Sequence, residues 1–132
     1  MPELSLRDRI LSADDRPKEA VFVPQWGLSV FVRTLSGAER DDWEASIVQQ
    51  KGKTTTYDLR NLRARLVCKC IVDEGGRRVF SDHEAEALGE KSAAALDLLF
   101  TVAQRLNALT NADVEDLGKA SGIAQSAGSG SG

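Results

Sequence analysis

The side chain best suited to acid–base chemistry is the one histidine of the chain, His83. It lies among Asp82, Glu84 and Glu86, in the first turn of a predicted helix. A catalytic histidine needs a nucleophile and an orienting group, and neither stands beside His83 in the sequence. We therefore expect a solvated surface histidine, an interpretation that a nucleophile brought close by the fold would change.

The two cysteines are the next candidates for chemistry. Cys68 and Cys70 are separated by one residue, whereas zinc sites use the spacing C-x-x-C and need a second pair of ligands. On a helix these two positions point about 200° apart. We expect Cys70 in the core and Cys68 at its flank, with no bound metal, no cofactor and no disulfide framework.

A third pattern, G-E-K-S at 89–92, has a weak similarity to a phosphate-binding loop. It lacks the upstream glycine of G-x-x-x-x-G-K-[ST], and a glutamate separates Gly89 from Lys91. One helix that ends at Gly89 and another that is capped by Ser92 explain all four residues. We therefore predict no nucleotide site here.

Nucleic-acid binding is the chemistry suggested by the most basic region, between residues 60 and 78. Its members are Arg60, Arg63, Arg65, Lys69, Arg77 and Arg78. Aromatic residues for base stacking are not interleaved among them, and the whole chain has a net charge of -3 and a pI near 5.2. We expect a solvated helix face or a contact for the acidic helix near residues 39–44, and no nucleic-acid partner.

Length and composition indicate one globular domain. The chain has 132 residues, 28% charged and 42% hydrophobic, and no apolar run approaches the roughly 18 residues of a membrane span. The N-terminal segment MPELSLRDRILSADDRP lacks the pattern of a secretory signal. We expect a cytosolic, reduced protein without a membrane partner, and an enzyme is the class least supported by these residues.

The elements that position these residues begin with a short helix, SLRDRIL, and a β-hairpin, EAVFVPQWGLSVFVRTL. Apolar residues alternate on both sides of the turn formed by residues 24–27. Ser36 and Glu39 form a capping-box pattern that opens a helix, which we expect to end at 50–53. We expect a loop at the threonine run 54–56.

The second half of the sequence predicts mostly helices. A long helix places Leu59, Leu62, Leu66 and Cys70 on one stripe, and RRVF at 77–80 is a candidate strand returning against 70–72. A second capping box at 81–84 starts a short helix, a long helix follows Ser92, and a last short helix surrounds Val114 and Leu117. The predicted fold is α+β, mostly helical: an N-terminal β-hairpin, then a bundle of about four to five helices. Residues 1–119 form the domain, and 120–132 a disordered Gly/Ser-rich tail whose GSGSG end is a possible cloning remnant.

The long helix after Ser92 is apolar on two sides. At the helical period, one row contains Leu96, Leu99, Phe100, Ala103 and Leu106, and a second contains Ala95, Leu98, Val102 and Leu109. Two interpretations stay open. Either this is a central helix covered on both sides by its neighbours, or one row builds the core and the other meets a partner.

Two long stretches carry a resemblance to a known family: VPQWGLSVFVRTLSGAERDDWE and ARLVCKCIVDEGGRRVFSDHEAEALGEKSAAALDLLFTVAQRLNALTNADVEDL. Together they resemble the tail assembly chaperones of long-tailed bacteriophages and related prophages, over about residues 4–117. The most specific segments are V-P-x-W-G, LSGAERD, VDEGGRRVFSD and LGEKSAAALD, and their order and spacing carry the resemblance.

The resemblance implies a non-enzymatic role in the host cell cytoplasm. Such chaperones bind the helical, aggregation-prone tape measure protein, keep it soluble and promote tail tube assembly around it, and they are absent from the mature virion. A longer, frameshifted form recruits the tail tube protein in many of these phages. Leu117, Gly118 and Lys119 can be encoded by CTG GGA AAG, which contains a run, GGGAAAG, on which a ribosome can slip.

A chaperone that holds helices needs an apolar groove or stripe with anchors at helical spacing. The candidate partner-binding residues are the row Leu98, Val102 and Leu109, with Trp26 and Phe31 on the hairpin as a second patch. The same surfaces could serve self-association, so that many copies coat one client. The main alternative function is a small virion structural or adaptor protein of the head–tail connector type, and a further one is a regulatory module that binds host nucleic acid or protein.

Overall fold

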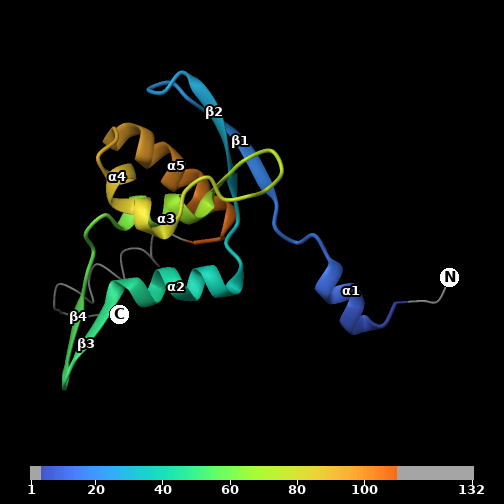
Figure 1. Ribbon diagram of the computed structural model, residues 1–132, viewed down its shortest axis with the longest axis horizontal. Helices are drawn as coiled ribbons and strands as arrows, with labels where there is room; N and C mark the ends of the chain where they lie inside the picture. The colour runs from blue at the N-terminus through green and yellow to red at the C-terminus, as the bar shows by residue number, and fades with distance from the viewer. Residues whose placement is uncertain (1–3, 110–132) are drawn as a thin grey trace, which may run out of the picture.

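The computed structural model describes residues 4–109, which form a small α+β fold that is mostly helical (Figure 1). The elements are, in chain order, α1 Leu6–Ser12, β1 Lys18–Val23, β2 Leu28–Arg33, α2 Gly37–Ile47, β3 Val48–Lys51, β4 Thr54–Tyr57, α3 Leu62–Cys70, β5 Ile71–Val72, the 3-10 helix η1 Asp82–Glu84, α4 Ala85–Gly89 and α5 Ala93–Leu106. The predicted N-terminal hairpin followed by helices is confirmed.

The hairpin β1–β2 is the main part of a three-stranded antiparallel sheet. Its strands pair from Lys18 opposite Arg33 to Val23 opposite Leu28, and Gly27 closes the turn with a φ of 66°, which glycine adopts without strain. β5 joins the other edge of β2, so the sheet order is β1-β2-β5. The sheet thus links the hairpin directly to the end of α3, a connection that the sequence left undecided.

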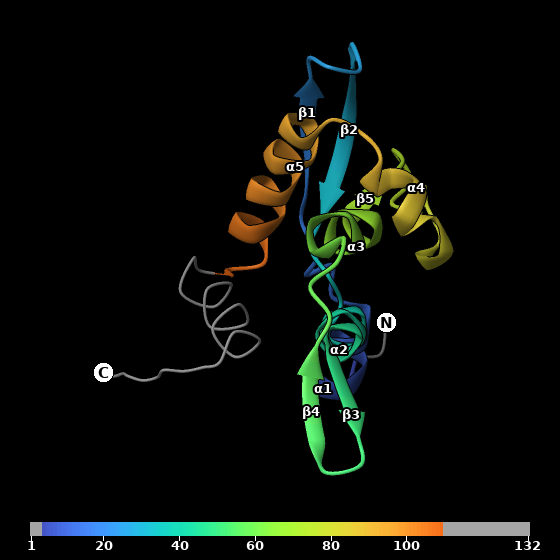
Figure 2. The same cartoon turned by 90° about the vertical axis from the view of Figure 1, so that its left-hand side faces the viewer.

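Helices α3 and α5 cover one face of the sheet and form the core with it (Figures 1 and 2). The alternating valines of the hairpin point into this core, as the period of a half-buried strand requires. The largest fully buried side chains are Trp43, Ile47, Leu66, Ile71, Leu99, Val23, Val32, Val67, Cys68 and Cys70. α2 contributes Trp43 and Ile47 from the side, so one continuous core joins α2, α3, α5 and the sheet.

Local capping signals set the starts of the helices. The Ser36 hydroxyl accepts from the backbone N–H of Glu39 at 3.1 Å, and the Glu39 carboxylate accepts from the backbone N–H of Ser36 at 2.9 Å. This is the predicted capping box of α2. The Ser92 hydroxyl caps α5 by accepting from the backbone N–H of Ala95. α4 ends at Gly89, as predicted.

Four sequence-based expectations about these elements are wrong in detail. α2 ends at Ile47 and the chain continues as strand β3, whereas the sequence predicted a helix as far as 50–53. The threonine run is strand β4, which pairs with β3 in a second, polar hairpin whose turn contains Gly52 with a φ of 61°. α3 begins at Leu62 rather than before Leu59, because Asn61 adopts a left-handed backbone conformation with a φ of 56°. The RRVF segment contributes one isolated bridge, between Val72 and Arg78, instead of a strand.

Three further predictions lie outside the described residues: the helix around Val114 and Leu117, the domain boundary at 119 and the tail from 120.

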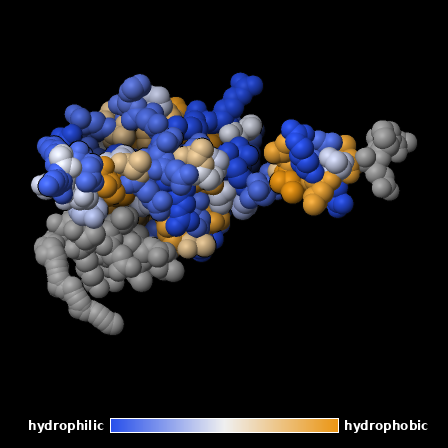
Figure 3. Space-filling view, turned by 90° about the horizontal axis from the view of Figure 1, so that it is seen from below, coloured by the Kyte–Doolittle hydropathy of each residue, from blue (hydrophilic) through white to orange (hydrophobic). Residues whose placement is uncertain are grey.

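Helix α1 stands apart from the rest of the fold (Figure 1). None of its residues is buried, and the segment Ala13–Pro17 connects it to β1. Figure 3 shows hydrophobic surface gathered on this projecting helix. We call residues 4–12 the arm.

Candidate functional site

The groups with potential for covalent or acid–base chemistry are not brought together. His83 is exposed on η1, whereas both thiols are buried. Burial raises the pKa of the Cys70 thiol to about 12, and burial also raises the pKa of Cys68. A thiol with a raised pKa is a poor nucleophile at neutral pH, because the thiolate is the reactive form. Cys70 lies in the core as predicted, and Cys68, expected at the flank, is equally buried.

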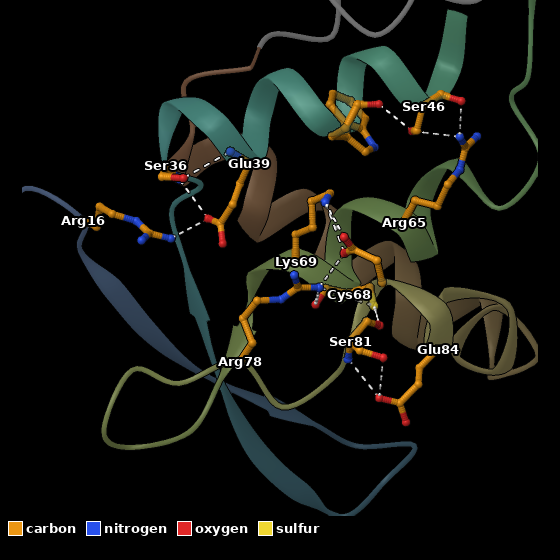
Figure 4. Close-up of polar contacts among 12 residues, drawn as sticks. Arg16, Ser36, Glu39, Ser46, Arg65, Cys68, Lys69, Arg78, Ser81 and Glu84 are labelled. Atoms are coloured by element: carbon orange, nitrogen blue, oxygen red, sulfur yellow. Dashed lines mark hydrogen bonds and ion pairs between the residues drawn. The ribbon is translucent and has the colours of Figure 1, made fainter. Parts of the chain in front are cut away.

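A polar network beside α3 is structural in character (Figure 4). The nearly buried Lys69 contacts both carboxylate oxygens of Asp82 at 3.1 Å, and Arg78 contacts the same carboxylate at 2.7 Å. The hydrogen bond from Arg78, followed by the one from Lys69, lowers the pKa of Asp82. The Cys68 thiol donates to the backbone carbonyl of Ser81 at 2.9 Å. These contacts fasten η1 to α3, and the Asp82 carboxylate pairs with two cations, Lys69 and Arg78.

Among residues 4–109, no group of three or more histidine, cysteine, aspartate or glutamate side chains is arranged to hold a metal ion. The helices of the same range are all too short or too polar to cross a bilayer.

The described residues include a cleft of about 350 Å³ between α3 and α5, which we call the α3–α5 cleft. Its floor is apolar and consists of Leu59, Leu62, Leu96 and Phe100. Small residues border it, among them Ala93 at the exposed first position of α5. A floor of this kind with small side chains at its border can admit the apolar face of a short helix.

The rim of the α3–α5 cleft is charged. Arg63 on α3 and Asp97 on α5 form an ion pair at 2.7 Å, and both side chains are more than half exposed. Lys91 lies on the rim as well. An exposed ion pair contributes about 0–1 kcal/mol, so this pair can open at little cost when a ligand enters.

The predicted partner-binding residues have different environments in the structure. Val102 and Leu109 are buried, with 8% and 7% of their surface exposed, so they offer a partner little surface in this conformation. Leu98, Trp26 and Phe31 are half-buried. Leu98 and Trp26 pack partly against the core, and the Lys18 ammonium lies over the Phe31 ring. Burial of both rows of α5 agrees with the interpretation of a central helix covered on both sides.

The exposed apolar surface lies mostly elsewhere, on the arm and the hairpin. Leu6, Ile10 and Leu11 on the arm are 70%, 62% and 68% exposed, and Phe22 on β1 is 59% exposed. The sequence analysis identified the arm as a helix with Leu6 and Ile10 on one side but gave it no function. The α3–α5 cleft was also missed, because its residues come from three separate segments of the chain.

Comparisons with known proteins agree with this architecture. The family described as "Phage tail assembly chaperone" matches residues 5–120. Among solved structures, the tail assembly chaperone of bacteriophage HK97 is similar, with a TM-score of 0.54 and 20% sequence identity, covering 76% of this chain and 95% of that one. At this identity the structural match shows a shared fold. A search of curated proteins found no significant match. The family match spans most of the chain, which therefore belongs to the phage tail assembly chaperone family.

Proposed function

We propose that the chain is a non-enzymatic chaperone that binds the tape measure protein in the host cytoplasm, keeps it soluble and promotes assembly of the tail tube around it. The observation that carries this proposal is the α3–α5 cleft, whose apolar floor and charged rim suit the apolar face of a helix. The burial of both thiols and the pairing of Asp82 with Lys69 and Arg78 give no support to a catalytic role.

The client surface in this proposal has two parts. The first is the α3–α5 cleft, which accepts apolar anchors at i, i+3, i+4 and i+7 of the client helix. The second comprises Leu98, Trp26 and Phe31, which keep part of their surface exposed. Val102 and Leu109 are buried in the core and contact the client only if α5 moves.

The test is co-expression with the tape measure protein of the same phage, followed by centrifugation and measurement of the soluble client fraction. Ala93→Glu places a charge at the border of the cleft without removing a buried side chain, and we expect it to reduce the soluble fraction at least tenfold. Ala94→Glu is the matched control, since Ala94 is exposed on the same turn but does not line the cleft. Equal activity of the two variants contradicts binding in the cleft, and an insoluble client with the wild-type chain contradicts the chaperone function itself.

Two further measurements address the remaining parts of the proposal. Mass spectrometry of purified particles separates an assembly chaperone, which we expect to be absent, from a head–tail connector, which would be present. Sequencing of the gene at codons 117–119 tests for the slippery run at Leu117–Lys119. If that run is followed by an overlapping frame, a longer form is made whose extension we propose to bind the tail tube protein.

A further inference from the structure

The arm has the composition of a helix made for docking. Leu6 and Ile10 are four residues apart and share one face, and Leu11 extends the apolar surface beside them. A helix of seven residues is marginal in water by itself, since isolated helices become stable only at about 12–15 residues or more. The arm therefore depends for its stability on contacts that it does not make with the described part of its own chain.

The base of the arm is held firmly to the body. Arg16 donates two hydrogen bonds to the Thr34 carbonyl, at 3.1 and 2.9 Å. It also forms an ion pair with Glu39 at 2.6 Å (Figure 4). The backbone N–H of Thr34 donates to the carbonyl of Pro17 at 3.2 Å. Only residues 13–15 separate α1 from this anchor, and three residues span at most about 10 Å.

This anchor prevents the arm from reaching the α3–α5 cleft of its own chain. The arm projects from the start of β1 on the side away from α3 and α5, and in Figure 1 the sheet lies between the arm and these two helices. A helix layer adds about 10 Å to this path, which exceeds the reach of the short connection. Any occupation of the cleft by an arm must therefore take place between two copies.

The α3–α5 cleft and the arm match in polarity and in charge. The cleft offers an apolar floor, and the arm offers apolar side chains that are more than 60% exposed. Among the charged residues, Arg63 and Lys91 on the rim can pair with Asp8 and with the acidic residues after the arm. Asp97 can pair with Arg7, which lies beside Ile10 and Leu11 on the arm. We propose that the arm of one copy binds in the α3–α5 cleft of a second copy.

Because the arm and the cleft are different surfaces, this contact is heterologous. Such contacts either close into a reciprocal exchange of arms or continue head-to-tail from copy to copy. A continuing array would let many copies coat one long client. One consequence rests on the function proposed above: the arm and a client helix compete for the same cleft, so that client binding releases self-associated copies.

The test is the mass of the full chain by sedimentation velocity over a concentration series, without any client. We expect the wild-type chain to self-associate. Leu6→Glu combined with Ile10→Glu should weaken this association about 100-fold or more, because two aliphatic anchors are lost. Arg9→Ala with Ser12→Glu is the control, since it changes the charge by the same amount on the polar side of the arm and should leave association unchanged.

A mixing experiment then identifies the partner of the arm. The arm variant retains an intact cleft, and Ala93→Glu retains an intact arm, so each alone should be a monomer while an equimolar mixture should form a dimer. Circular dichroism checks that both variants are folded, which we expect because every changed side chain is exposed. A monomeric wild-type chain, an associating arm variant, an associating Ala93→Glu variant or a mixture that stays monomeric would each overturn the proposal. None of these outcomes depends on the tape measure protein.

Discussion

Helices α1 and α5 are both amphipathic, yet they use their apolar residues in opposite ways. α5 is a central helix: it packs against α3 and against both strands of the hairpin, and six of its residues are buried. α1 has no buried residue, and its apolar side chains are more than 60% exposed. α5 has the larger apolar surface, but little of that surface remains exposed, because neighbouring elements cover α5 from two sides. Surface available to a partner depends on the topology around a helix, and only secondarily on the number of its apolar residues.

The largest difference in stability should appear when a charge is introduced into α5 and, separately, into α1. Val102→Asp puts a carboxylate into the core, where it has no partner, and should reduce the free energy of unfolding by more than about 3 kcal/mol. Ile10→Asp adds the same charge to the exposed arm and should change it by less than about 0.5 kcal/mol. Urea denaturation followed by circular dichroism measures both. A stable Val102→Asp variant would mean that the second row of α5 is open to partners after all.

The features of the fold that the sequence predicted are the ones encoded locally. The capping boxes, the Pro-Gln-Trp-Gly turn and the alternation of the hairpin each lie within a few residues, and all three predictions are confirmed. The β3–β4 hairpin was missed because its strands are polar and give no alternation. The β-branched threonines beside Gly52 were the available signal.

The candidate site was predicted less well, because it depends on contacts between distant segments. The α3–α5 cleft combines residues near 60, near 90 and on α5, and no periodicity in the sequence brings these together. The exposure of Leu6 depends on Arg16, which fixes the arm away from the body. Val102 is the opposite case, a residue predicted to contact a partner that is buried instead. Both α3 and the hairpin pack on α5, an arrangement that the helical pattern alone left open.

A second, smaller effect should come from two ion pairs. One involves the buried Lys69, and the other lies on the exposed rim of the α3–α5 cleft. Asp82→Asn deprives the nearly buried Lys69 of its anionic partner, and we expect a loss of about 1–3 kcal/mol at neutral pH. Asp97→Asn breaks the exposed pair with Arg63 and should cost about 0–0.5 kcal/mol. Chemical denaturation of both variants provides the comparison, and equal losses would contradict it.

The pH dependence of the Asp82 contribution follows from its lowered pKa. Hydrogen bonds from Arg78 and Lys69 hold the pKa of Asp82 in the folded chain below its ordinary value of 3.8. Protons therefore bind more readily to the unfolded chain, and the stabilisation is complete well above pH 3.8 and is lost as the pH falls through the folded pKa. The difference in stability between wild type and Asp82→Asn should shrink steadily below that pH. A difference that stays constant with pH would show that the carboxylate charge contributes nothing.

The smallest effect separates the two serine caps. Ser36→Ala removes the hydroxyl that caps α2, the helix that places Trp43 and Ile47 in the core. This variant should reduce the free energy of unfolding by about 1 kcal/mol.

The Ser5 hydroxyl caps α1 in the same way, accepting from the backbone N–H of Asp8 at 3.1 Å. Because none of the residues of α1 is buried, Ser5→Ala should leave global unfolding unchanged in the monomer. It should instead weaken self-association, since a frayed arm must pay the cost of ordering before it can bind. Urea denaturation at low protein concentration and sedimentation at high concentration distinguish the two effects, and a shift of the unfolding midpoint by Ser5→Ala would show that the arm belongs to the cooperative core.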